Sequence, residues 1–111
     1  MKEKCIPIHL ASVNSTNTWA KEHIKDLEYN QITRITASEQ TAGRGRLKKE
    51  WVSPKDQNIY LTYFFSFPKL FEKTAHLTQF FSVTLSTLLQ EYGLIPSIKW
   101  PNDLLVNKKK I

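Results

Sequence analysis

Residues 40 to 54 read QTAGRGRLKKEWVSP, and this stretch separates the two segments of the chain with the clearest strand character. Gln31 to Ala37 contains four β-branched residues, and Asn58 to Phe67 (NIYLTYFFSF) gives the strongest strand signal in the sequence. The connection between them, about 20 residues without hydrophobic periodicity, is unusually long for a compact domain, and such connections are usually functional. The sequence therefore predicts two strands flanking a functional loop at 38–57.

The loop between these strands has the composition of an anion-binding site. Gly43 and Gly45 let the backbone approach an anion closely and offer bare N–H donors, while Arg44 and Arg46 add planar guanidinium groups that match phosphate or carboxylate oxygens. Residues 41–55 hold five basic side chains and one acidic side chain. Because the charge is focused in a glycine-containing loop, a small polyanion is a better ligand than nucleic acid or an anionic membrane.

Upstream of the loop, the sequence predicts a strand and then a helix. Ile6 to Leu10 alternates as a short strand, and the Ser/Thr/Asn cluster at Asn14 to Thr18 is typical of a helix N-cap. An apolar face runs from Trp19 to Leu27 and predicts one helix that ends near Tyr29. The groups at this helix N-terminus are also able to hydrogen-bond a neutral polar ligand, through Ser15, Thr16 and Asn17.

Downstream of the loop, the sequence predicts a long core helix and short strands. Residues 73–92 carry a continuous apolar stripe, and Gly93 stands where a left-handed C-terminal cap is expected. The stripe consists of Leu77, Phe80, Phe81, Leu85, Leu88, Leu89 and Tyr92. Strands and turns are then expected at Ser97 to Trp100, Pro101 to Asp103, Leu104 to Asn107 and Asn107 to Lys110, with a further strand beginning at Ile111.

Composition bounds the class of protein. The chain has 111 residues, of which 41% are hydrophobic, so it suits one globular domain with a modest core. Its one cysteine, Cys5, excludes an internal disulfide and a thiolate metal cluster. No apolar run approaches the roughly 20 residues of a membrane span, and the N-terminus lacks an apolar signal region. We therefore expect a cytoplasmic protein.

The motifs exclude some chemistries and favour another. The sequence has no paired-histidine metal spacing, no GxSxG elbow and no Cys/His couple, so we expect no metal ligands and no hydrolytic machinery. Lys99 lies in an otherwise apolar strand and is costly to bury unless it faces an anion, for which Asp103 and a bound ligand are both candidates. Five cationic side chains suit phosphoryl or nucleotidyl transfer, in which an enzyme positions the reactants and neutralises negative charge: Arg44, Arg46, Lys48, Lys49 and Lys99. The alternative is that they are only solvated surface charges.

Three segments together resemble the biotin protein ligases, and they cover nearly the whole chain. These are STN at Ser15 to Asn17, EQTAGRGRLKKEWVSPKDQNIYLT at Glu39 to Thr62, and KWPNDLLV at Lys99 to Val106. The resemblance implies an α+β fold of the class II aminoacyl-tRNA synthetase/biotin synthetase type: a mixed, mainly antiparallel sheet, helices packed on one face, and the 38–57 loop over the site.

The resemblance also implies a two-step reaction. Biotin and ATP, the latter with Mg²⁺, give biotinyl-5′-AMP, and biotin then passes to a lysine of a biotin carboxyl carrier protein, with no tightly bound cofactor. Lys99 and Arg44 correspond to the catalytic cations, and Trp51 to the tryptophan near the adenine. The other residues that correspond to contacts with biotin and the adenylate are Ser15, Thr16, Asn17, Gln40, Gly43, Gly45 and Arg46.

The chain departs from the family pattern in two respects. The usual loop continues GRxGRxW, and here Lys48 and Lys49 hold the second glycine and arginine positions. We expect residues 1–111 to be part of a catalytic domain, without an N-terminal winged helix and without the C-terminal β domain. No DNA or membrane partner is expected, and homodimerisation through an open sheet edge is plausible.

Two other functions remain open at this stage. Lipoate ligases share the fold, but carry a different arginine and triple-glycine loop. A non-enzymatic basic module would bind nucleic acid through the GRGR loop and the aromatic side chains of NIYLTYFF, although half of those aromatics should point into the core.

Overall fold

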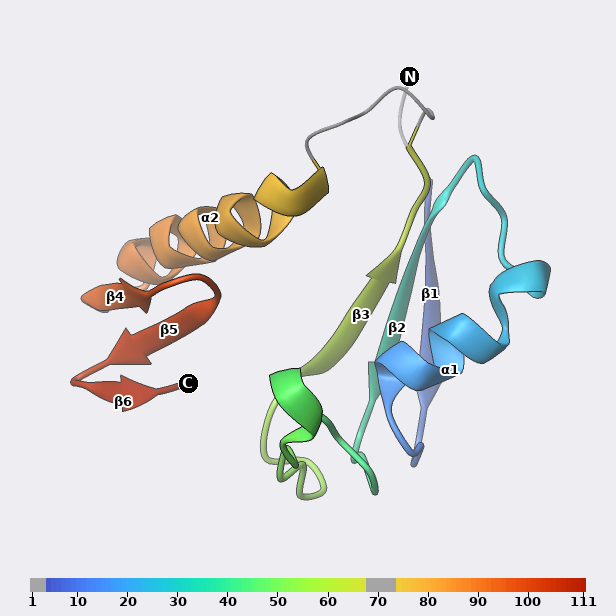
Figure 1. Ribbon diagram of the computed structural model, residues 1–111, viewed down its shortest axis with the longest axis horizontal. Coiled ribbons are helices and arrows are strands. Elements are labelled where there is room, and N and C mark those ends of the chain that lie inside the picture. Colours follow the sequence, from blue (N-terminus) through green and yellow to red (C-terminus); the bar gives the residue numbers. More distant parts are fainter. Residues whose placement is uncertain (1–3, 68–73) are drawn as a thin grey trace. The chain divides into compact units, whose positions relative to one another are not determined.

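The computed structural model describes residues 4–67 and 74–111 (Figure 1). The chain forms two compact units, Met1–Phe67 and Pro68–Ile111, and each is considered by itself. Within the described ranges, no helix has both the length and the apolar character needed to cross a membrane.

The first unit is built on a three-stranded mixed sheet in the order β1-β2-β3. Strand β1 (Cys5–Leu10) pairs in parallel with β2 (Ile32–Ala37), and β2 pairs antiparallel with β3 (Tyr60–Phe64). The three strands occupy the segments that the sequence predicts, since β-branched and aromatic side chains pack well on a pleated surface.

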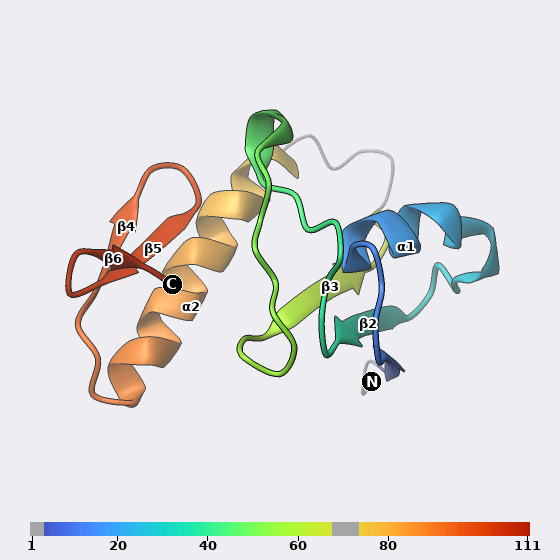
Figure 2. The same cartoon turned by 90° about the horizontal axis from the view of Figure 1, so that it is seen from below.

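Helix α1 (Thr16–Glu22) lies across β2 and β3 and closes the small core of this unit (Figure 2). Its N-cap is Ser15, whose Oγ accepts a hydrogen bond from the Thr18 N–H at 3.3 Å, as the Ser/Thr/Asn cluster predicts. The most buried side chain is that of Ile35 in β2, with no exposed surface, and Leu27 and Tyr60 are buried with it.

The prediction of one helix extending to near Tyr29 is wrong. Helix α1 ends at Glu22, and a separate 3-10 turn, η1 (Ile24–Asp26), follows. The boundary is at the C-cap His23, whose backbone leaves the helical conformation with φ of −104° and ψ of 12°. Its ring stacks on Trp19 at a centroid distance of 4.0 Å, and its Nδ1 lies 2.8 Å from the Trp19 carbonyl oxygen.

The second unit consists of a helix and an antiparallel sheet in the order β4-β5-β6. A 3-10 turn, η3 (Thr74–His76), leads into α2 (Leu77–Glu91). Gly93 ends the helix with φ of +81°, and its N–H donates to the Gln90 carbonyl while that of Leu94 donates to Leu89, which confirms the predicted left-handed cap. The strands are β4 (Pro96–Lys99), β5 (Asp103–Val106) and β6 (Lys109–Lys110).

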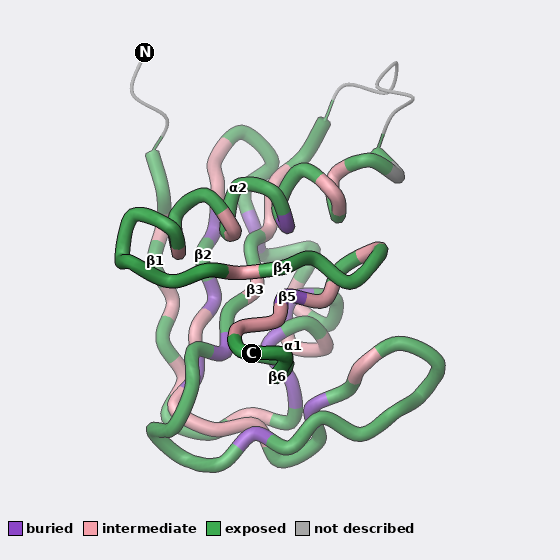
Figure 3. The backbone as a smooth tube through the Cα atoms, turned by 90° about the vertical axis from the view of Figure 1, so that its left-hand side faces the viewer, coloured by how far each residue is buried: buried purple, intermediate pink, exposed green. Residues whose placement is uncertain are grey.

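Two sequence predictions for this unit are wrong. The last turn comprises only Asn107 and Lys108, both with φ above +50°, so β6 already begins at Lys109 instead of at Ile111. Two consecutive left-handed residues form the tight connection that suits the twist of an antiparallel pair. The predicted core helix also keeps most of its apolar stripe exposed (Figure 3), including Phe80 at 65% and Tyr92 at 78%. Of the three short strands of this unit, only β4 and β5 contact α2.

Candidate functional site

The 38–57 connection is folded, although the sequence shows no periodicity there. Residues 43–51 form a narrow hairpin, here called the GRGR hairpin. The Trp51 N–H donates to the Gly43 carbonyl at 2.8 Å, and the Gly45 N–H donates to the Lys49 carbonyl at 2.7 Å. A 3-10 turn, η2 (Arg46–Lys48), makes its tip. These bonds satisfy the backbone of a segment that would otherwise depend on water.

Gln40 anchors the hairpin to the segment that precedes α1. It forms a parallel bridge with Val13 and an antiparallel bridge with Ser53. Its backbone N–H donates to the Ser53 carbonyl at 3.2 Å, and the next two N–H groups donate to Val13 at 2.9 Å and to Asn14 at 2.8 Å. The two motifs STN and GRGR, far apart in the sequence, are therefore held against each other within the first unit.

The two glycines of the hairpin have different structural roles. A Cβ at Gly43 would lie 2.6 Å from the Trp51 carbonyl oxygen and 2.7 Å from the Ser53 Oγ, so no other residue fits there without movement. A Cβ at Gly45 would approach nothing closer than the Trp51 ring at 3.5 Å, which is an ordinary contact. Gly43 is required by close packing, whereas Gly45 leaves room beside the tryptophan.

The tip of the hairpin contains two non-glycine residues with left-handed backbone. Leu47 has φ of +56° and Lys48 has φ of +60°. Lys48 stands where the family pattern has its second glycine, and the conformation is one that glycine adopts without steric cost. The lysine holds this left-handed conformation at a cost of about 1–2 kcal/mol.

A hydrogen-bonded network joins the hairpin to α1 and to β3. The Thr16 N–H donates to Gln40 Oε1 at 2.9 Å, and Thr16 Oγ1 lies 2.8 Å from Thr62 Oγ1. Gln40 Nε2 donates to Ser53 Oγ at 3.0 Å. Sequence reasoning did not assign Ser53 or Thr62 to the site, although both fall inside the segment that resembles the family, and that inclusion was the only available signal.

An open cavity of about 670 Å³ lies along the hairpin. Of the residues predicted for the site, four line it: Gln40, Gly43, Arg44 and Trp51. The others in this unit do not line it: Ser15 and Thr16 are buried at the start of α1, and Asn17, Gly45 and Arg46 lie outside it. Lys48 and Ser53 also contribute to the lining.

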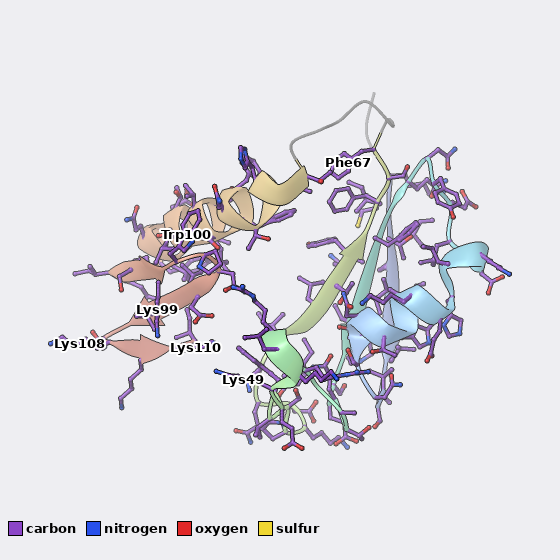
Figure 4. All side chains as sticks on the ribbon, in the orientation of Figure 1. Lys49, Phe67, Lys99, Trp100, Lys108 and Lys110 are labelled. Carbon is purple, nitrogen blue, oxygen red and sulfur yellow. The ribbon has the colours of Figure 1, made fainter. Side chains whose placement is uncertain are left out.

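The hairpin carries a local excess of positive charge. Arg44, Arg46, Lys48 and Lys49 are all exposed, and none of them forms a salt bridge with a carboxylate in the described part of the chain. Lys49 is labelled at the hairpin in Figure 4. Arg44 Nη2 makes one long hydrogen bond, 3.4 Å to Thr18 Oγ1 at the start of α1. These cations are available to an anionic ligand without first breaking an ion pair.

Lys99 lies in the second unit, at the end of β4 (Figure 4). It is exposed and faces Asp103 across the β4–β5 register. The salt bridge of Asp103, however, is with Lys110, whose Nζ lies 3.0 Å from Oδ1. Of the two candidate partners for Lys99, the carboxylate is therefore already paired, and a role for Lys99 in ligand binding stays a prediction.

The described residues supply no group of three or more histidine, cysteine or acidic side chains able to hold a metal ion. The cations and backbone N–H groups are instead suited to phosphate or carboxylate oxygens.

Comparison with known proteins gives consistent matches. A family model described as the biotin/lipoate A/B protein ligase family matches residues 9–111. The chain is 35% identical over 79 residues to the bifunctional ligase/repressor BirA of Bacillus subtilis, covering 70% of this chain and 24% of that protein. It is 29% identical over 103 residues to BirA of Escherichia coli, covering 92% and 32%. The chain thus spans about a quarter to a third of the length of these curated relatives.

Solved structures match in the same way. Biotin protein ligase from Aquifex aeolicus, in complex with biotin and ATP, superposes with a TM-score of 0.81 at 34% identity, covering 96% of this chain and 44% of that one. The biotin acetyl coenzyme A carboxylase synthetase of Helicobacter pylori, with bound biotinylated ATP, gives 0.77 at 26% identity, covering 97% and 52%. The mixed α+β fold expected from the sequence is confirmed.

Proposed function

The chain belongs to the biotin/lipoate A/B protein ligase family, and we propose that residues 1–111 form part of the catalytic domain of an ATP-dependent biotin protein ligase. In the first step the biotin carboxylate attacks the α-phosphorus of ATP, giving biotinyl-5′-AMP and releasing pyrophosphate. In the second, a lysine amine of a carrier protein attacks the activated carbonyl and releases AMP. The attachment of the two motifs STN and GRGR to each other through Gln40 carries this proposal.

The reaction brings two anions together, a carboxylate and a triphosphate. It therefore needs fixed positive charge and N–H donors more than it needs an acid or a base. Arg44 and Arg46 of the hairpin are proposed to bind the adenylate phosphate, and Trp51 to lie beside the adenine. Ser15, Thr16, Asn17 and Gln40 are proposed to bind biotin, and Lys99 to stabilise the oxygens of the mixed anhydride.

Mg²⁺ enters this proposal as part of the nucleotide. The described residues offer no acidic cluster that would hold the ion alone. Mg²⁺ is commonly bound through substrate phosphates with only one or two protein carboxylates. We therefore propose that it arrives with ATP, where it offsets charge on the departing pyrophosphate.

Biotin is proposed in preference to lipoate because the solved relatives named above contain biotin or a biotinylated nucleotide. A carrier protein as acceptor is part of the same proposal. The expected cytoplasmic location and the expected absence of a DNA partner stay predictions.

The proposal is tested by calorimetric titration with a non-hydrolysable biotinyl-adenylate analogue. Wild-type protein is expected to bind it, and Arg44→Ala is expected to weaken binding about ten- to a hundredfold, because a charge-assisted hydrogen bond is lost. Arg34→Ala is the matched control, since Arg34 is an exposed arginine in β2 outside the hairpin. A folded wild-type chain that fails to bind the analogue, or equal losses in the two variants, would contradict the proposal.

A further inference from the structure

We propose that Thr62 and Ser53 are positioning residues that hold the side-chain amide of Gln40 in one orientation for ligand recognition. This inference rests on the biotin-binding role proposed above. It assigns a function to two polar side chains that the reaction itself does not require, and it fixes the kind of ligand atom that Gln40 is able to contact.

The orientation of the amide follows from its neighbours. The backbone N–H of Thr16 can only donate, so the Gln40 atom 2.9 Å away must be the oxygen Oε1. The nitrogen Nε2 then lies 3.0 Å from Ser53 Oγ and donates to it. Ser53 Oγ donates in turn to the Trp51 carbonyl at 3.1 Å. A flipped amide would place N–H against N–H and would lose the bond to Thr16.

The same argument assigns the threonine hydroxyls. Thr16 Oγ1 donates to Gln40 Oε1 at 3.3 Å, which uses its only hydrogen. The contact of 2.8 Å between Thr16 and Thr62 therefore has Thr62 as the donor. The hydrogen bonds run in one direction, from Thr62 in β3 to Thr16 in α1, then to Gln40, and through Ser53 to the backbone of Trp51. Bonds aligned in this way strengthen one another.

Burial makes the arrangement costly to change. Thr16 is 3% exposed and Ser53 is 6% exposed. A buried polar group that loses its partner pays its full desolvation cost, which exceeds the net gain from a typical hydrogen bond. The network should therefore keep one orientation before any ligand arrives.

The consequence concerns what Gln40 offers to the cavity that it lines. Its oxygen already accepts from two groups of Thr16, whereas its nitrogen uses one of two hydrogens. The remaining N–H is a donor, so Gln40 is suited to an oxygen acceptor of the ligand, such as a ureido carbonyl or a carboxylate. Removal of the Thr62 hydroxyl would take away the bond that holds the Thr16 side chain, and would leave the amide held only by the Thr16 N–H and by Ser53.

The test uses three threonine variants and two measurements. Thr62→Val removes the donor with little change in shape, and Thr62→Ser keeps a hydroxyl. Thr84→Val is the matched control, because Thr84 is exposed in α2, does not line the cavity, and its hydroxyl donates to the Phe80 carbonyl of its own helix at 2.8 Å. Amide ¹⁵N–¹H spectra of the free chain report the backbone of Thr16 and the side-chain amide of Gln40, and calorimetry reports the affinity for biotin.

We expect Thr62→Val to shift both reporter signals and to weaken biotin binding roughly three- to tenfold, by the value of one hydrogen bond. Thr62→Ser should restore both properties, and Thr84→Val should match the wild type. A Thr62→Val chain with unchanged signals, or with shifted signals and wild-type affinity, overturns the inference. If Thr62→Val does not fold, Ser53→Ala, which removes the acceptor for Gln40 Nε2, decides by the same two criteria.

The two proposals fail in distinguishable ways. A wild-type chain that binds no biotin refutes the proposed function, while the spectra still show whether Thr62 orients Gln40. A wild-type chain that binds biotin, with unchanged spectra in Thr62→Val, refutes only the positioning role.

Discussion

Gly43→Ala and Gly45→Ala test the structure of the GRGR hairpin within a single motif. An alanine Cβ at Gly43 would lie 2.6 Å from the backbone oxygen of Trp51, a separation that real Cβ atoms essentially never show. Backbone on one side of the hairpin must move, and the bond from the Trp51 N–H to the Gly43 carbonyl is then strained. Overpacking of this kind typically costs about 1–3 kcal/mol.

The same substitution at Gly45 should be tolerated. The nearest atom to its Cβ would be 3.5 Å away, and its backbone, with φ of −92° and ψ of −169°, is extended and open to alanine. Replacing glycine at a compatible position reduces the entropy of the unfolded chain and stabilises a protein by about 0.4–1 kcal/mol. The two variants are therefore expected to change stability in opposite directions.

Urea unfolding followed by circular dichroism measures the free energy of unfolding of each variant. Titration with the biotinyl-adenylate analogue measures the affinity of each variant for the ligand. Gly43→Ala should unfold at a lower urea concentration and bind more weakly, because Ser53 Oγ, which holds Gln40, lies 2.7 Å from the new Cβ. Wild-type stability in Gly43→Ala, or equal destabilisation by both substitutions, would refute the reasoning.

Three further variants probe other features. Lys48→Gly should raise the free energy of unfolding by about 0.5–1 kcal/mol. The strain that φ of +60° places on lysine is relieved, and this gain exceeds the cost of the greater conformational entropy of glycine in the unfolded chain. A urea midpoint below that of the wild type would contradict this. Gly93→Ala should lower the free energy of unfolding, measured by thermal unfolding, by about 1 kcal/mol. Alanine is strained at φ of +81°, although its Cβ would meet no atom within 4 Å. Asp103→Asn should lose less than about 1 kcal/mol, since its salt bridge with Lys110 is partly exposed; an equal loss in high salt would show that charge is not the cause.

Local physical chemistry was sufficient for most of the secondary structure. The N-cap at Ser15, the left-handed cap at Gly93 and the strands around Ile35 and Tyr60 each depend on side chains close in sequence. The end of α1 at Glu22 did not follow from periodicity, because the apolar pattern continues beyond it to Leu27.

For the candidate site, too, some features were predictable from the sequence and others were not. The glycines and arginines of the GRGR motif predict an anion-binding loop from composition alone, since glycine lets the backbone approach an anion and arginine donates to its oxygens. Their separate roles were not visible in the sequence: Gly43 is excluded from bearing a Cβ by Trp51 and Ser53, while Gly45 is not. The left-handed backbone of Lys48, at a position where the family pattern has glycine, was likewise not visible in the sequence.

The sequence alone determined the order of strands and helices, the family, and the segments that carry positive charge. Only the tertiary structure decided which polar groups meet, as Gln40 does with Thr16 from α1, and as Thr16 does with Thr62 from β3. The physical reason is range: caps, turns and strand propensity act over a few residues, whereas a hydrogen bond between residues 16 and 62 exists only after the sheet has brought them together.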